Sequence, residues 1–379
     1  MTITVRSVDI TTTTGVLYMA MELAQSKWCL AFGNGLKMRQ ITVEANDTNA
    51  LQEAIKKAKE KFSLPLESKI ISCYEAGRDG FWIHRYLEVN KITNYVVDSS
   101  SIEVPRKKRR AKTDRLDAEK LLKQLIAYVK GENKLDVARV PKEEEEDRRR
   151  MHRERERLKK ERTQHTNRIG SLLNLHGIKC AKGKKNWDAY LNEVTDWKGE
   201  ALPTYLKEEL LREAARLDLI EKQLKALELN MQEFLKTGKD TVSINIQGLM
   251  NLKGIGEVSS WILVMEWFGW RHFNNRREVG AAAGLVGTPY DSGDSQREQG
   301  ITKAGNHRIR AIMIELSWLW LRYQPNSELS KWFNERFNHG KRSRKVGIVA
   351  LARKLLIALW RYITTGEIPK GAALKSCTV

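Results

Sequence analysis

Short β-rich runs alternate with polar turns and helical stretches in the N-terminal quarter of the chain. From Val16 to about Ser100 the pattern predicts, in order, VLYMAM, KWCLAFG and RQITVEA as strands, NALQEAIKKAKEKF as a helix, KIISCYEA as a strand, GFWIHRYLEV as a helix and NYVVDS as a strand. Strands interleaved with helices indicate an α/β layer architecture. The order suits an RNase H-like sheet. A doubly wound nucleotide-binding domain would need a glycine-rich first turn, and none follows the first strand.

A different pattern begins at Pro141. As far as about Leu175 both charge signs are dense and apolar residues are few, which predicts a long exposed helix. A second helix is predicted further on. Its apolar residues begin with Leu210 and continue, one heptad later, at alternating spacings of three and four: Leu217, Ile220, Leu224, Leu227, Met231 and Phe234. We interpret these positions as a coiled-coil seam. The two helices are expected either to pack as an antiparallel hairpin or to pair with a second subunit.

From about Thr241 the chain becomes apolar and aromatic again, with seven of its eleven tryptophans beyond residue 260. Helices are predicted in SSWILVMEWFGW, HRIRAIMIELSWLWLRYQ and VGIVALARKLLIALWRYIT, so this part should be mostly helical. The stretch GLVGTPYDSGDSQREQGITKAGN is rich in Gly, Ser, Asp and Thr, and we expect it to be loop. The predicted domains are therefore 1–140 (α/β), 141–240 (coiled-coil dimerisation segment) and 241–379 (all-α).

The charge of the chain points to a polyanionic partner. Lys and Arg number 67 against 47 Asp and Glu, giving a formal net charge of +20. Nucleic acid is the commonest partner of such a chain, and a membrane surface is the other candidate. No run of about 18 uncharged apolar residues is present, and the first residues lack the apolar core of a signal peptide. We therefore expect an intracellular protein with no membrane segment.

Cysteine and histidine offer no metal-binding pattern. The four cysteines, Cys29, Cys73, Cys180 and Cys377, are far apart, and the seven histidines form no pair at ligand spacing. The cysteines are interpreted as small buried or inert residues. Any metal must then be held mainly by oxygen, which favours magnesium or manganese.

Four acidic residues stand where metal chemistry would place them. Glu22 and Glu75 end predicted strands, and Asp114 and Asp117 open a predicted helix at a spacing that puts both carboxylates on one face. Carboxylates at strand ends and on a helix face suit a two-metal phosphoryl-transfer site. The other interpretation is that the aspartates only offset the helix macrodipole.

A basic tract precedes the two aspartates directly. It holds Arg106, Lys107, Lys108, Arg109, Arg110 and Lys112. Such a tract brings phosphates to the acids, although a solvated turn or a localisation signal would have the same composition.

Two further motifs lie in the C-terminal part. Gly254-Ile255-Gly256 resembles the turn of a helix-hairpin-helix, which holds a phosphate with backbone N–H groups, and is equally an ordinary turn between helices. Ser292, in a predicted loop before Gly293, could attack or hold a phosphodiester, although Ser-Gly is commonly only a turn and Ser295 is an equal candidate by residue type. Four cations follow the first serine: Arg297, Lys303, Arg308 and Arg310.

The order of these parts resembles the DEDD transposases of insertion sequences, of the insertion sequence 110 type, which include bridge-RNA-guided recombinases and are related to Piv-type DNA invertases. The family's acidic quartet falls on Glu22, Glu75, Asp114 and Asp117, and its S-G and G-I-[ST]-K-x-G-N elements fall on Ser292-Gly293 and GITKAGN. The sequence departs from the family at the first acid, which is normally Asp. Glutamate is one methylene longer and can still ligate magnesium after a small shift.

The resemblance implies an RNase H/RuvC-like N-terminal domain, a coiled-coil dimerisation segment and a C-terminal transposase domain with Ser292 as nucleophile, assisted by the metal site. It implies a homo-oligomer, dimer or tetramer, acting on donor and target DNA under the guidance of a non-coding bridge RNA, in a prokaryotic cytoplasm at the nucleoid. Two other functions remain open from the residues: a RuvC-like junction nuclease that hydrolyses DNA with water, and a non-catalytic nucleic-acid-binding scaffold.

Overall fold

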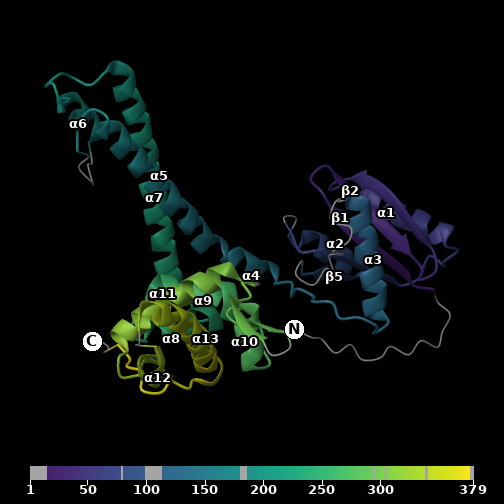
Figure 1. The fold of residues 1–379 in the computed structure, drawn as a ribbon. Helices are drawn as coiled ribbons and strands as arrows, with labels where there is room; N and C mark the ends of the chain where they lie inside the picture. The colour runs from purple at the N-terminus through teal and green to yellow at the C-terminus, as the bar shows by residue number, and fades with distance from the viewer. Residues whose placement is uncertain are drawn as a thin grey trace. The chain divides into compact units, whose positions relative to one another are not determined.

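The computed structural model describes residues 15–77, 80–98, 113–179, 186–292, 295–303, 305–337 and 340–375, without the side chains of residues 290–299. The chain divides into two compact units, Met1–Val140 and Pro141–Val379, and each is described by itself (Figure 1). Within the described ranges, none of the helices is both long and apolar enough to cross a membrane.

A five-stranded sheet is the framework of the first unit. Its strands are β1 (Leu17–Leu23), β2 (Lys27–Gly33), β3 (Met38–Glu44), β4 (Ile70–Glu75) and β5 (Thr93–Val97). Their spatial order is β3-β2-β1-β4-β5. Strands β1, β2 and β3 form an antiparallel meander, whereas β4 runs parallel to both β1 and β5. The mixed α/β layer predicted from the sequence is confirmed, and the carboxyl ends of β1 and β4 lie side by side.

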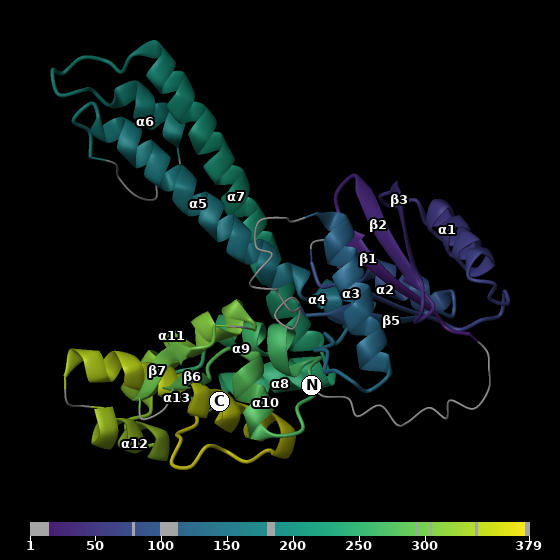
Figure 2. The ribbon, with the colours of Figure 1, turned by 45° about the vertical axis from the view of Figure 1, so that its right-hand side comes forward.

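Helices cover both faces of this sheet, as Figure 2 shows. They are α1 (Thr48–Lys61), α2 (Trp82–Val89) and α3 (Asp114–Val129). Successive side chains of a strand point to opposite faces. Accordingly, Met19 and Met21 of β1 belong to a core shared with α1 and α2, while Ala20 belongs to a second core shared with α3. The α3 face is the one that matters for the acidic residues.

A long helical hairpin begins the second unit. Its helices are α4 (Glu143–Arg148), α5 (Arg150–Asn174), α6 (Trp187–Glu193) and α7 (Thr204–Thr237). Ion pairs between α5 and α7 are Arg155–Glu228 at 2.7 Å, His165–Glu213 at 2.6 Å and Arg168–Glu209 at 2.6 Å. As the residue number rises along α5 it falls along α7, so the two helices are antiparallel neighbours (Figure 2).

The apolar seam of α7 is used within this hairpin. Leu158 of α5 forms a small buried core with Ile220 and Leu224, and Leu227 packs against it. Of the two packings left open by the sequence, the structure has the intrachain hairpin. A dimer through this segment stays a prediction, and it would need a surface other than the buried side of this seam.

The rest of the second unit is helical around a tryptophan-rich core. Its helical elements are α8 (Thr241–Met250), α9 (Glu257–Leu263), the π-helical segment η3 (Val264–Phe268), α10 (Arg276–Ala282), α11 (His307–Tyr323), α12 (Glu328–Phe337) and α13 (Lys341–Thr365). Trp261, Trp267 and Trp320 are almost fully buried in its centre. The helical character predicted for this part is confirmed.

One segment of this part is not the loop that we expected. The structure has an antiparallel hairpin of β6 (Gly287–Ser292) and β7 (Ser295–Ile301). Gly, Ser and Asp made the stretch look irregular, but a Gly-Asp pair between two short runs is also a signal for a β-hairpin. The loop prediction gave too much weight to composition and too little to that pair.

Candidate active site

Glu22 and Glu75 occupy matching positions on neighbouring strands. Strands β1 and β4 are parallel, with Ala20 opposite Cys73, so the register places Glu22 opposite Glu75 two residues further along. Ala20 and Cys73 both belong to the core under α3. Because side chains two residues apart share a face, both glutamates lie on the α3 side of the sheet. Both are half-buried, at the strand ends where the core gives way to solvent.

The two aspartates belong to the first turn of α3. Thr113 is the N-cap of this helix, and its side chain accepts a hydrogen bond from the backbone N–H of Leu116. Gln40 of β3 fixes the same turn, because its side-chain amide donates to the carbonyl oxygen of Arg115 at 2.7 Å. Asp114 is exposed and Asp117 is half-buried. The sequence therefore builds a capped helix start, held to the sheet, with two acids on it.

Cys29 of β2 shows that the strand end and the helix start are close. Cys29 lies opposite Glu22 in the β1–β2 register. Burial raises the pKa of its thiol, the Arg115 guanidinium lowers it, and the carboxylates of Asp114 and Glu22 raise it again. Cys29 also belongs to the buried core under α3, which contains Ala118, the residue after Asp117. The strand end that carries Glu22 and the first turns of α3 therefore lie on the same side of the sheet, and a metal site shared by their acids stays a prediction.

The acids do not form a ready-made metal cluster. Among the described residues, no three His, Cys, Asp or Glu side chains lie close enough to bind one ion. Asp117 instead pairs with Lys120 one turn along α3, at 3.0 Å. Carboxylates also repel one another when no cation lies between them. Carboxylate oxygens are suitable ligands for a hard divalent cation, and these carboxylates belong to the α3 side of the sheet. To bind such an ion, Asp117 would have to give up its ion pair with Lys120.

Lys120 is a residue that the sequence analysis missed. Its signal was present in KTDRLDAEK, where a lysine follows Asp117 at helical spacing. The predicted basic tract, Arg106 to Arg110 with Lys112, lies outside the described residues, as do Cys180 and Cys377. The other two cysteines, Cys29 and Cys73, are buried and free, as interpreted.

The candidate serine of the second unit lies at the end of β6. The backbone of Ser292 pairs with that of Ser295 in the β6–β7 register. Arg297 lies two residues further along β7, opposite Tyr290. The two serines are thus cross-strand partners at the tip of one hairpin, and position alone does not discriminate between them.

The GITKAGN element that follows has a clear structural role. Gly305 has a φ of +101°, and a Cβ there would lie 2.1 Å from the carbonyl oxygen of Ala282. Asn306 caps α11, because its side-chain oxygen accepts from the backbone N–H groups of Arg308 and Ile309. Only glycine combines the positive φ with this close approach. The element therefore ends the β-hairpin and starts α11.

The predicted phosphate-binding cations of this region differ in their surroundings. Lys303 is exposed. Arg308 pairs with Glu156 of α5 at 3.1 Å, and Arg310 donates to the carbonyl oxygen of Ala283 at 3.2 Å. Both arginines are half-buried and hold α11 to its neighbours. Of these three, Lys303 alone is exposed, and it has no hydrogen bond or ion pair with the residues that the structure describes.

The Gly254-Ile255-Gly256 turn connects α8 to α9, as the sequence predicted. Gly254 has a φ of +86°, and a Cβ there would meet the carbonyl oxygen of Leu319 and the Cβ of Tyr323, each at 3.3 Å. Ile255 is buried, and Gly256 is the N-cap of α9. The turn is therefore packed tightly against α11, which accounts for the first glycine without any ligand.

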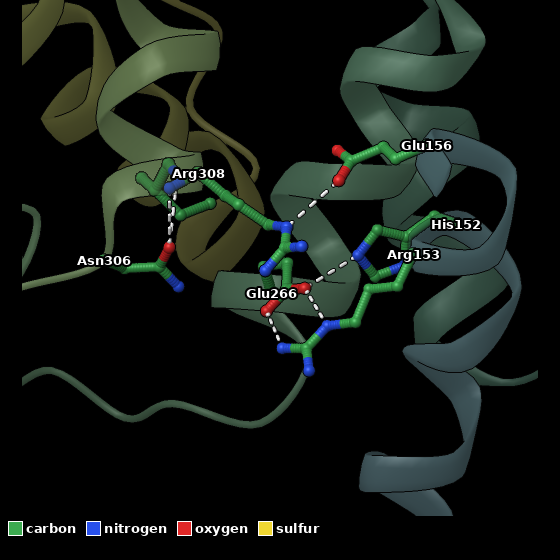
Figure 3. A network of polar contacts seen from close by, with 7 residues as sticks. His152, Arg153, Glu156, Glu266, Asn306 and Arg308 are labelled. Carbon is green, nitrogen blue, oxygen red and sulfur yellow. Dashed lines mark hydrogen bonds and ion pairs between the residues drawn. The ribbon is translucent and has the colours of Figure 1, made fainter. Parts of the chain in front are cut away.

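A buried carboxylate joins the base of the hairpin to the helical part, and the sequence analysis missed it. Glu266, in the middle of η3, is 1% exposed. Its Oε1 accepts from His152 Nε2 at 2.8 Å and from Arg153 Nε at 2.6 Å, and its Oε2 accepts from Arg153 Nη2 at 2.8 Å (Figure 3). Burial would raise the pKa of Glu266, but these hydrogen bonds outweigh it and hold the pKa well below its usual value. Its signal was a lone acid in the apolar run SSWILVMEWFGW, since such acids are rarely buried unpaired.

This network extends to the start of α11. Figure 3 shows Arg308 reaching Glu156, one turn beyond His152 and Arg153 on α5, while Asn306 caps α11. Ion pairs thus link α5 to both η3 and α11, which are far apart in the sequence. The α5–η3–α11 network holds the end of the segment that follows the serine hairpin.

Comparison with known proteins places both units among transposases. The model of the Transposase IS116/IS110/IS902 family matches residues 246–331, and the DEDD transposase model of the insertion sequence 110 type matches residues 10–178. "Putative transposase y4rJ" of Sinorhizobium fredii is 41% identical over 380 residues, covering 96% of this chain and 95% of that protein. The transposase for insertion sequence element IS1111A of Coxiella burnetii is 26% identical over 265 residues, covering 68% of each chain. The transposase for insertion sequence element IS1328 of Yersinia enterocolitica is 26% identical over 222 residues, covering 58% of this chain and 63% of that one.

The class is therefore that of transposases, enzymes that cleave and rejoin DNA. This chain belongs to the IS116/IS110/IS902 family and carries the DEDD type of N-terminal domain. The resemblance inferred from the acidic quartet and from GITKAGN is confirmed at the level of the family.

Proposed function

We propose that this transposase cleaves and rejoins DNA through the hydroxyl of Ser292, assisted by Mg²⁺ or Mn²⁺ held by four carboxylates. The carboxylates are those of Glu22, Glu75, Asp114 and Asp117. The observation that carries the proposal is the register of β1 and β4, which sets two glutamates side by side on the face where α3 begins with two aspartates. The strand order of this unit also supports an RNase H/RuvC-like fold.

The chemistry divides between the two units. A serine hydroxyl is a weak nucleophile at neutral pH and needs help to lose its proton. Its oxygen forms a bond to phosphorus while the bond from phosphorus to a DNA sugar oxygen breaks, and the proton goes to the leaving oxygen. Rejoining is the reverse step with another DNA end. A bound divalent ion supplies stabilisation of the negative charge on the attacking and leaving oxygens.

The groups proposed for catalysis come from both units. The carboxylates belong to the unit Met1–Val140, and Ser292 belongs to Pro141–Val379. Neither unit should cut DNA alone. The six-residue strand β6, which ends with the serine, is followed by β7, the Gly305 turn and the α5–η3–α11 network, which would hold the hairpin in place.

We further propose that a non-coding bridge RNA from the flanks of the element pairs with donor and target DNA, in a homodimer or tetramer at the nucleoid. The net charge of +20 supports a large nucleic-acid surface. The remaining support is the family resemblance. RNA from the flanks of the element should co-purify with the native protein, and its absence would count against guidance.

The metal site is tested by Asp117→Asn. Plasmid recombination in magnesium should be abolished, because the variant keeps the shape of the side chain and loses the charge that attracts the ion. Glu119→Gln is the matched control on the same helix, since among the described residues Glu119 pairs only with the exposed Lys123. Recombination by Asp117→Asn at the wild-type rate would show that the site is wrongly assigned.

The nucleophile is tested by Ser292→Ala against its cross-strand partner Ser295→Ala. A covalent protein–DNA adduct, trapped on denaturing gels, should vanish in the first variant and persist in the second. The opposite pattern moves the nucleophile to Ser295. If neither variant affects recombination, serine chemistry is excluded and hydrolysis by water, as in a junction nuclease, takes its place. If the wild type cleaves no DNA strand in magnesium or manganese, the chain is a non-catalytic nucleic-acid-binding scaffold.

A further inference from the structure

A basic groove in the second unit is lined by residues of α10 and α13, together with the start of α12 and residues 367–370. Two adjoining hollows form it, with volumes of about 360 Å³ and 510 Å³, and they share Arg276, Lys354 and Ile357 in their walls. The charged residues that line it are Arg276, Arg277, Arg353, Lys354, Arg361, Lys370, Glu328 and Glu367. Six cations against two acids give the groove an excess of four positive charges.

The cations of the groove are largely uncompensated. Within the part of the chain that the structure describes, Arg277, Arg353 and Arg361 form no ion pair. Lys354 lies over the ring of Trp332, 4.6 Å from its centre. Unpaired cations side by side repel one another, which favours the binding of an anion between them.

Helix α13, which lines the groove, is itself strongly basic. Lys341–Thr365 contains seven Lys and Arg and no Asp or Glu. Helix α7, by contrast, has six Lys and Arg and seven Asp and Glu, and much of its charge is paired. Helix α13 therefore carries a net charge of +7 (seven minus none), whereas α7 carries −1 (six minus seven).

One arginine is held in position by close packing. A Cβ on Gly280 of α10 would lie 3.2 Å from Cγ and 3.3 Å from Cδ of Arg353. The aliphatic stem of Arg353 therefore packs directly on the backbone of α10 at Gly280. Arg353, Ile357 and Arg361 recur every four residues and line the groove along α13. The two arginines are about 12 Å apart along the helix, the rise of three to four nucleotides in one strand.

We propose that the α10/α13 groove binds the phosphate backbone of DNA. The partner is DNA because the chain is a transposase, and backbone contact is inferred because the walls offer cations and an apolar floor rather than a set of hydrogen-bonding side chains for base edges. The groove would position DNA irrespective of its sequence. This inference rests on the family's DNA substrate and does not depend on the serine or on the metal.

The test measures DNA binding in chains that cannot cut. Full-length Asp117→Asn is compared with the same chain carrying Arg353→Glu and Arg361→Glu. A 30-base-pair duplex of arbitrary sequence is titrated at several salt concentrations. The groove variant should bind about tenfold more weakly or worse near 100 mM salt, and the slope of log affinity against log salt should fall by about 2, one for each lost phosphate contact.

The control reverses two exposed cations of α7, Lys225→Glu and Lys236→Glu, and so changes the net charge equally. It should bind within about twofold of the parent. An equal loss in both variants would mean a general charge effect and would overturn the groove. The same variants are also titrated with an RNA hairpin of matched length. If the groove variant loses affinity for this RNA and not for the DNA duplex, the groove is an RNA-binding site instead. Arg353→Gln with Arg361→Gln, checked for a native tryptophan emission spectrum, keeps the test valid if the reversal disturbs folding.

Discussion

Replacing Glu266 by glutamine removes one negative charge from the centre of the second unit with almost no change in volume. The carboxylate is 1% exposed and His152 is 2% exposed, while the side chain of Arg153 is 43% exposed. Glutamine has one oxygen and one NH₂ group. It can therefore accept from only one side, and its NH₂ group must face another donor.

The magnitude follows from these exposures. Removing one partner of a buried ion pair costs about 3–5 kcal/mol, because the other charge stays buried. Here the Arg153 head reaches water and recovers part of its hydration, whereas His152 does not. We expect a loss of about 3 kcal/mol in the free energy of unfolding of the second unit.

Urea unfolding followed by tryptophan fluorescence measures this loss, since nine of the eleven tryptophans lie beyond residue 140. An unchanged m-value would assign the shift to stability alone. The matched control is Glu154→Gln on α5, whose carboxylate has an exposed ion pair with Arg157 at 3.7 Å. Such a pair is worth about 0–1 kcal/mol. A loss below about 1 kcal/mol in Glu266→Gln would refute the reasoning, because the buried carboxylate would then be dispensable.

Acidity gives a second readout for the same carboxylate. The pKa of Glu266 is depressed from 4.5 in the folded chain. The stabilisation of the folded state by the Glu266 carboxylate is therefore complete above about pH 4.5, and it is lost as the pH falls towards the pKa of this group in the folded chain. The difference in stability between wild type and Glu266→Gln should be constant near neutral pH and shrink below about pH 4.5. A difference that stays constant to pH 3 would contradict the depressed pKa.

Three further predictions concern other parts of the chain. Glu22→Asp should leave plasmid recombination equal or raise it, and a total loss would show that the longer side chain is required. Leu224→Asp puts a charge into the seam between α5 and α7 and should cost about 3 kcal/mol in urea unfolding, against less than about 0.5 kcal/mol for the exposed Leu229→Asp; equal effects would remove the intrachain seam. Gly305→Ala combines a positive φ with a backbone clash at 2.1 Å, whereas Gly300→Ala has a φ of +88° and nothing within 4 Å, so thermal unfolding should show a clearly larger loss in the first.

The sequence predicted the elements where periodicity was strong. The strand and helix order of the first unit, the charged helix after Pro141, the seam of α7 and the three tryptophan-rich helices all appear in the structure. Each of these depends on a repeat within one segment, and such a repeat reports which side of the element is buried. The β6–β7 hairpin was missed because its strands are short and their composition is typical of loops.

The candidate site was only partly predictable. Residue types and strand ends singled out Glu22, Glu75, Asp114 and Asp117, but the local pattern says nothing of which neighbour each carboxylate meets. Only the structure pairs Asp117 with Lys120.

The sequence by itself determined the class of elements, the excess of positive charge and the acids at the strand ends, because each is a property of a few adjacent residues. The tertiary structure decided the β1–β4 register, the intrachain partner of the α7 seam and the meeting of His152 and Arg153 with Glu266, more than 110 residues away. It also gathered the cations of α10 and α13 into one groove. These arrangements join segments that are distant along the chain, and packing of the whole unit, rather than any local repeat, selects which of them meet.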